Sequence, residues 1–142
     1  MVLDANDTAR LEAKISAAER KACVQIVVAV ARGPSWLGIH RKASKLFRKH
    51  HLERTRNRNG VLLLLVPRDR EFLVYGDQAI HDAVGQHYWD DLQEGMSAYF
   101  REGRFYEGLS LAVGKVADRL EPLFPPQHEV ADELPNRIIF TR

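Results

Sequence analysis

The amino-acid sequence predicts a three-layer α/β/α sandwich built around a small mixed β-sheet. Two short runs, residues 24–31 and 61–66, are almost continuously apolar, which is typical of strands buried on both faces. Segments with helical spacing of apolar residues precede, separate and follow these runs. Strands of this kind need helices on both sides of the sheet, because neither face can be left in water.

The first half of the chain is expected to hold two helices and two strands. A helix over residues 7–22 has Asn6 or Asp7 as its N-cap and is followed by the strand 24–31. Gly33 and Pro34 end that strand, and a second helix runs from an N-cap at Ser35 to about residue 51. A basic connector, residues 52–59, leads into the strand 61–66. The apolar stripes of the two helices are Leu11, Ile15, Ala18 and Ala22, and Ile39, Ala43, Leu46 and Phe47.

The second half begins with a turn and is otherwise helical. Pro67 starts a tight turn, after which residues 71–75 return as an antiparallel strand. Helices are expected over residues 86–101 and 105–123, and Leu123 is expected to point inward. One domain therefore covers residues 1–126, and residues 127–142 form a tail. The apolar, β-prone segment 137–141 of this tail is expected to dock on the parent domain or on the sheet edge of a partner.

The order of elements also predicts how the strands pair. Strands 24–31 and 61–66 are joined through a helix, so we expect them to be parallel. Strands 61–66 and 71–75 are joined by a tight turn and form a hairpin. Five aromatic residues are expected to pack in the core or between helices. They are Trp36, Trp89, Phe100, Phe105 and Tyr106.

Composition restricts the class of protein. The chain has 142 residues, 45% of them hydrophobic and 28% charged, which is ordinary for one globular domain. Its apolar runs are far shorter than a membrane span, and its N-terminus lacks the pattern of a secretory leader. The single cysteine, Cys23, excludes an intramolecular disulfide and a cysteine-based zinc site. These observations favour a soluble protein of the cytoplasm.

The formal charge of +2 hides a basic segment at residues 41–58, which holds eight Lys and Arg residues against Glu53 alone. Such a segment can attract phosphate, anionic lipid or nucleic acid, or it can be a solvated helix face. Arg54, Arg56 and Arg58 are the anion-binding candidates. His50 and His51 end the basic helix, and one of them is expected to interact favourably with the helix dipole.

An acidic loop follows the third strand. Asp77 and Asp82 bracket the strand end, and Asp90, Asp91 and Glu94 lie on the next helix. Carboxylate oxygens in loops beyond strand ends suit hard cations, so calcium or magnesium is the candidate ligand. The alternative is that Asp77 or Asp82 caps a turn or a helix. No sequence feature indicates an organic cofactor.

The segment NGVLLLLVPRDREFLVYGD (residues 59–77), together with IHDAVGQHYWDDL and FREGRFYEGL, resembles the TPM domain family, and in particular its short soluble bacterial subgroup. The family includes a thylakoid protein with acid phosphatase activity, and some bacterial members bind calcium. The resemblance therefore implies the same α/β fold and a cation site. This chain departs from the family pattern at Gln25 and Arg58, where relatives carry acids, and at Ala79, where glycine is usual.

Catalytic motifs are missing from the sequence: it has no G-x-S-x-G motif and no phosphate-binding glycine loop. The leading hypothesis is a non-catalytic accessory or interaction domain that also binds calcium weakly. The alternative is a metal-assisted acid phosphatase acting on phosphomonoesters. The tail predicts a protein partner or self-association. We do not expect nucleic acid as the partner, because no recognised nucleic-acid-binding motif is present.

Overall fold

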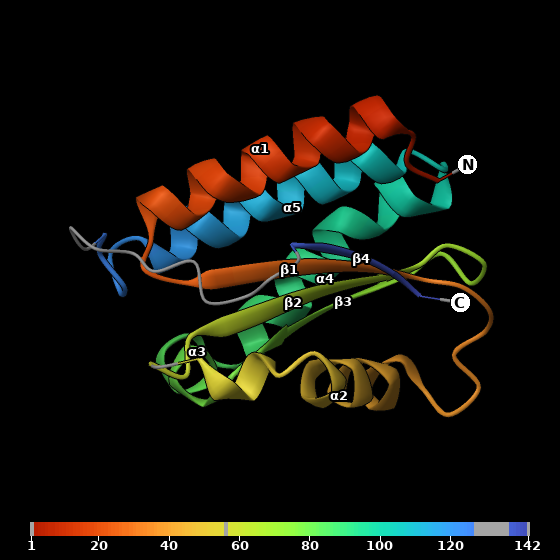
Figure 1. Cartoon of the computed structure of the whole chain (residues 1–142). Coiled ribbons are helices and arrows are strands. Elements are labelled where there is room, and N and C mark those ends of the chain that lie inside the picture. Colours follow the sequence, from red (N-terminus) through yellow and green to blue (C-terminus); the bar gives the residue numbers. More distant parts are fainter. Residues whose placement is uncertain (1, 56, 127–136, 142) are drawn as a thin grey trace.

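The computed structural model describes residues 2–55, 57–126 and 137–141. Within these residues, four strands form one mixed sheet in the order β3-β2-β1-β4 (Figure 1). Helices cover both faces of the sheet, so the predicted three-layer α/β/α sandwich is confirmed. The strands are β1 (Gln25–Ala31), β2 (Gly60–Val66), β3 (Glu71–Gly76) and β4 (Ile138–Thr141). The helices are α1 (Ala5–Lys21), α2 (Ile39–Lys49), the 3-10 turn η1 (Leu52–Arg54), α3 (Gln78–Val84), α4 (Gln86–Arg101) and α5 (Phe105–Leu120).

The strand pairing follows from the connections. β1 and β2 are parallel, with α2 between them in sequence, and Val28 lies opposite Leu63. β2 and β3 form the predicted hairpin, in which Leu64 lies opposite Leu73. β4 pairs in parallel with β1, so residues 138–141 form one edge of the parent sheet.

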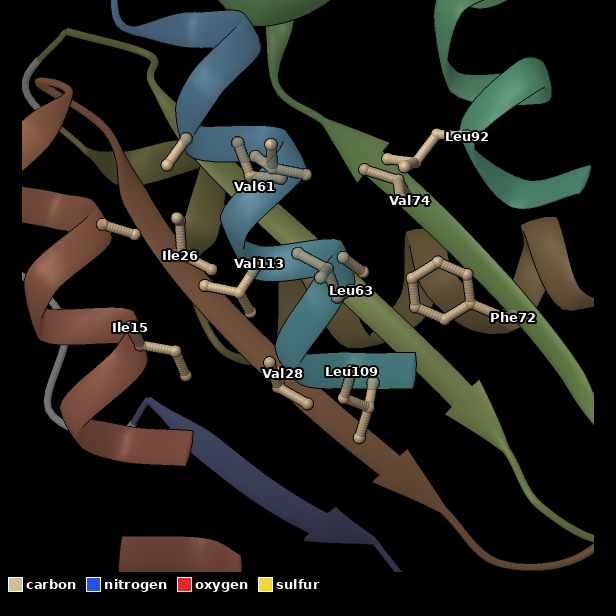
Figure 2. Close-up of a cluster of buried hydrophobic side chains, with 14 of the residues drawn as sticks. Ile15, Ile26, Val28, Val61, Leu63, Phe72, Val74, Leu92, Leu109 and Val113 are labelled. Atoms are coloured by element: carbon tan, nitrogen blue, oxygen red, sulfur yellow. The ribbon is translucent and has the colours of Figure 1, made fainter. Parts of the chain in front are cut away.

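Alternate residues of the strands fill two separate cores. Ile26 and Leu63 face α1, α4 and α5, as Figure 2 shows for the cluster that also includes Ile15 and Val113. Val27, Ala29 and Ala31 of β1 instead belong to the second core, with residues of α2. Because side chains alternate across a strand, a strand that is apolar at every position supplies both layers. All seven residues of β1 and all seven of β2 are buried.

Helix ends differ from the sequence prediction in three places. The N-cap of α1 is Asp4 rather than Asn6 or Asp7. Asp4 accepts the Asp7 N–H at 2.7 Å, while the Asp7 carboxylate accepts the Asp4 N–H at 3.2 Å. The second helix begins at residue 39, so the prediction that Ser35 caps it was wrong. The last helix ends at Leu120, and Leu123 is 41% exposed rather than inward, because the chain has already turned away.

A buried carboxylate connects the start of β4 to the helical layer that contains α1. Glu19, on α1, accepts the Ile26 N–H at 2.9 Å and the Arg137 guanidinium at 2.8 Å. Arg137 immediately precedes β4, so this ion pair helps to fix where the edge strand begins. In the described parts of the chain, no helix is long and apolar enough to cross a membrane.

Candidate functional site

The acidic loop predicted from sequence lies where β3 ends. Asp77 directly follows β3 and is the N-cap of α3, because its carboxylate accepts the Gln78 N–H at 2.8 Å. The side chain is only 5% exposed. It lines an open concavity of about 490 Å³ that Glu53, His81 and Trp89 also line. The capping role that the sequence offered as the alternative is therefore present.

Arg58 occupies both carboxylate oxygens of Asp77. Its Nε donates to Oδ2 and its Nη2 donates to Oδ1, each at 2.7 Å. This two-pronged contact, together with the negative charge, raises the pKa of the Arg58 guanidinium. Arg58 is thus the counter-ion of the buried Asp77.

A tight turn brings Arg58 to this position. Arg58 has a positive φ of 52°, and its N–H bonds the Thr55 carbonyl at 3.1 Å. Asn59 then donates its side-chain amide to the Cys23 carbonyl at 2.8 Å, which fixes the start of β2 beside β1. Gly60 follows because a Cβ there would lie 2.8 Å from the Leu52 carbonyl oxygen. The glycine of the Asn-Gly pair is required by this close backbone approach.

The other predicted metal ligands point to local partners. Asp82 accepts from Gln78 Nε2 at 2.8 Å, and Asp90 accepts from Gln86 Nε2 at 2.9 Å. Asp91 lies 3.6 Å from His87 Nε2, and Glu94 is exposed on α4. Among residues 2–55, 57–126 and 137–141, no group of three or more His, Cys, Asp or Glu side chains is placed to hold a metal ion. A calcium or magnesium site at these five residues stays a prediction.

A second concavity, of about 790 Å³, lies between the β1–α2 connection and α2; we call it the basic groove. In Figure 1 this connection extends beyond the sheet before it returns to α2. The described lining contains six cationic side chains and no Asp or Glu. The six are Arg32, Arg41, Lys42, Lys45, Arg48 and Lys49.

The charges of the basic groove are not neutralised within the described structure. None of the six forms an ion pair with a described acidic side chain. Lys42 donates to the Arg32 carbonyl at 3.3 Å, which joins the two sides of the groove. Like charges held together over a concave surface create a positive potential that attracts anions.

Two large apolar side chains stand at the rim of the basic groove. Trp36 is 86% exposed and Leu37 is 73% exposed, and both contribute to the lining. The prediction that Trp36 packs in the core was wrong, because α2 begins three residues later and Trp36 lies in the connection. Trp89 and Phe100 are fully buried as predicted, and Phe105 and Tyr106 pack against the core while partly buried.

The anion-binding candidates named from sequence are not brought together. Arg54 is exposed and lies 4.0 Å from Glu53, whereas Arg58 is engaged by Asp77. Arg56 lies outside the described residues. Anion binding by these three arginines stays a prediction, and the structure instead gathers the cations of α2 with Arg32.

The fold and the groove define a small α/β/α domain with one strongly basic face. A family model described as the TPM domain matches residues 1–119, so the chain belongs to the TPM domain family. No curated protein sequence matches the chain at a significant level.

Two solved structures are similar in fold. One is the solution structure of the BA42 protein from the psychrophilic bacterium Bizionia argentinensis, with a TM-score of 0.87 and 28% identity over 97% of this chain and 94% of that one. The other is the N-terminal domain of a protein from P. gingivalis, with a TM-score of 0.76. At 20% identity over 90% of this chain and 82% of that one, it supports the fold alone.

Sequence reasoning missed the apolar rim and one cation. Arg32 was not grouped with the basic segment, because it precedes the loop that separates it from α2. The sequence does indicate that the rim residues lie in a loop. Trp36 and Leu37 stand between Gly33-Pro34 and Gly38, and glycine and proline on both sides of a short segment are typical of loops rather than helices. A large aromatic in a loop is a stronger indication of a binding surface than one in a helix stripe.

Proposed function

We propose that the chain is a non-catalytic interaction domain that binds an anionic partner in the basic groove. The observation that carries the proposal is the set of six cations that line one concavity with no acid among the described lining residues. Their mutual repulsion is relieved when an anion binds, and the aliphatic stems of Lys and Arg add apolar contact.

Polyanion binding provides the test. The wild-type chain should be retained on heparin and eluted by salt, because exposed charges are screened as ionic strength rises. Arg41→Glu with Lys45→Glu reverses two exposed cations of the groove and should move elution to clearly lower salt. Lys14→Glu with Lys115→Glu is the matched control, since it changes the net charge equally at exposed positions on α1 and α5.

The salt needed to elute the groove pair and the control pair from heparin decides whether the groove is the anion site. Equal shifts for both would mean that heparin responds only to net charge. Absence of wild-type retention in low salt would refute anion binding altogether. Arg54→Glu adds a further comparison, because it tests the segment that the sequence singled out first. A larger shift from Arg54→Glu than from the groove pair would place the anion site outside the groove.

Calcium binding at Asp77 is a separate expectation, supported by the resemblance to calcium-binding TPM domains. A cation there must compete with Arg58 for the same two oxygens. A ligand bound only by the folded state raises stability by about 2.7 kcal/mol at one hundred times its dissociation constant. A melting temperature that rises in millimolar calcium, and fails to rise in Asp77→Asn, would support the site. Equal wild-type melting temperatures in calcium and in chelator would argue against it.

Phosphatase activity is the alternative function taken from the family resemblance. It requires a nucleophile or a metal that orients water toward the phosphate. An assay of phosphomonoester hydrolysis with added calcium or magnesium tests it directly. Turnover that persists in Arg41→Glu with Lys45→Glu but is lost in Asp77→Asn would favour an enzyme over the interaction domain.

A further inference from the structure

The exposed apolar residues of the basic groove narrow the chemistry of its partner. In the described residues, the large hydrophobic side chains that are exposed are Trp36, Leu37, Leu123 and Phe140. Leu123 and Phe140 each have no neighbour in sequence among these four, whereas Trp36 and Leu37 are adjacent and are the two most exposed. Trp36 and Leu37 line the same concavity as the six cations, so an apolar pair stands beside a cationic surface.

The connection that carries Trp36 and Leu37 is held in place at its base. Ser35 donates its N–H to Asp69 Oδ2 at 3.0 Å, and its hydroxyl lies 2.9 Å from Glu71 Oε1. Gly33 and Gly38 flank the pair with positive φ angles of 77° and 95°. These conformations favour glycine, so the sequence is suited to a defined loop shape. A loop fixed before binding loses less conformational entropy when its tip is immobilised.

The combination of an apolar tip and a cationic surround matches the interface of a bilayer. Tryptophan is enriched at the level of lipid headgroups, and leucine is stable in the acyl region below them. Lysine and arginine next to such a tip reach the phosphates of anionic lipids. Single-stranded nucleic acid would use an aromatic ring for stacking, but it would give Leu37 no apolar environment.

We infer that the anionic partner of the basic groove is the surface of a phospholipid bilayer, with Trp36 and Leu37 inserted at the headgroup level. This inference rests on the proposed function of the groove and names its partner. In this orientation α2 lies along the membrane and its cations contact the headgroups. The layer formed by α1 and α5 lies on the opposite side of the sheet and faces away from the bilayer (Figure 1).

Tryptophan fluorescence offers a direct measurement, because the chain has two tryptophans in opposite environments. Trp36 is 86% exposed, and Trp89 is 1% exposed. Vesicles of phosphatidylglycerol and phosphatidylcholine should shift the wild-type emission to shorter wavelength and bind the chain in sedimentation. Vesicles of phosphatidylcholine alone should do neither at the same lipid concentration. Brominated acyl chains should quench the emission of Trp36, which requires no variant.

Variants separate the contribution of the inserted apolar side chains from that of the cations. Trp36→Ala with Leu37→Ala should lower the partition coefficient by at least about 10-fold and abolish the emission shift, because both inserted apolar side chains are removed. Arg41→Glu with Lys45→Glu should lower it by at least about 25-fold, since each charge near an anionic surface contributes roughly a 5-fold factor. The control pair Lys14→Glu with Lys115→Glu should retain most of the binding.

Each other outcome overturns the inference. If heparin binding depends on the groove but anionic vesicles neither bind the chain nor shift its emission, the partner is not a membrane and the proposed function stands. Vesicle binding that survives Trp36→Ala with Leu37→Ala unchanged would mean that no insertion occurs. Tighter binding to single-stranded polyuridine than to vesicles at equal phosphate concentration would identify nucleic acid as the partner. If the groove variants and the control pair weaken heparin binding equally, the proposed function itself is refuted.

Discussion

Trp89→Ala tests whether the first turn of α4 is held to the sheet by a buried tryptophan. Trp89 is 1% exposed in α4, and its ring lies 5.3 Å from that of Tyr88, centre to centre. Its Cζ2 lies only 3.8 Å from where a Cβ on Gly76 would stand, so the ring packs against the end of β3. Burial of about 200 Å² at about 25 cal/mol per Å² is worth roughly 5 kcal/mol.

One feature of the native state lowers that figure. The Trp89 Nε1–H finds no acceptor among the described residues, and an unpaired buried donor costs about 1–3 kcal/mol. Truncation removes this donor together with the ring. We therefore expect a loss of about 3 kcal/mol, at the low end of the range for buried Trp→Ala changes. For a domain of this size, that corresponds to a fall in Tm of roughly 6–12 °C.

Urea denaturation followed by far-ultraviolet circular dichroism is the assay, because it does not depend on tryptophan emission. Trp36→Ala is the matched control: the same substitution at an 86% exposed position should change stability by less than about 0.5 kcal/mol. Equal denaturant midpoints for Trp89→Ala and wild type would refute the packing argument. An equal loss in both variants would show that burial does not determine the effect.

Three further predictions concern packing, capping and pH. Gly108→Ala should destabilise by about 1–3 kcal/mol, since its Cβ would lie 2.6 Å from Phe100 Cε1, whereas Gly95→Ala, with open space at its Cβ, should be neutral or stabilising in thermal melts. Asp4→Ala should cost about 1 kcal/mol by removing half of the capping box, measured by urea denaturation; no loss would refute the cap. Burial, then the charges of Lys49 and His51, lower the pKa of His50. Its protonation is therefore favoured in the unfolded chain, and the free energy of unfolding should fall as pH drops below 6.5. His50→Gln should reduce that slope, and an unchanged slope would contradict it.

The direction of the His50 pKa shift was not evident from the sequence. A histidine at the C-terminus of a helix should interact favourably with the helix dipole, which would raise its pKa. His50 caps α2, but partial burial and the neighbouring Lys49 charge act in the opposite direction and prevail. Position along the helix was visible in the sequence, and burial was not.

The regular elements were predictable because their signals are local. The continuous apolar run at 24–31 indicated a doubly covered strand, and all seven residues of β1 are buried. The period of apolar residues around Trp89 gave the bounds of α4 without error. β4 has four residues and, among the described strands, pairs with β1 alone, so its sequence could suggest a strand but not its place in the sheet.

The site was less predictable because residues far apart in the sequence become neighbours only in the folded chain. Arg58 and Asp77 are 19 residues apart, and only the pairing of β2 with β3 makes them neighbours. Arg32 joins the cations of α2 because the connection after β1 folds back over that helix. Trp36 looked like a core residue because hydrophobicity alone does not reveal exposure.

The most direct test of the groove is to map ligand contacts by amide chemical shifts. The ¹⁵N-labelled chain would be titrated with a heparin hexasaccharide at low salt. We predict that the largest changes fall on residues 32–38 and on α2, with Asp77 and Gln78 nearly unchanged. Changes centred on Arg54, Arg58 and Asp77, or no saturable change at all, would contradict the basic groove as the binding surface.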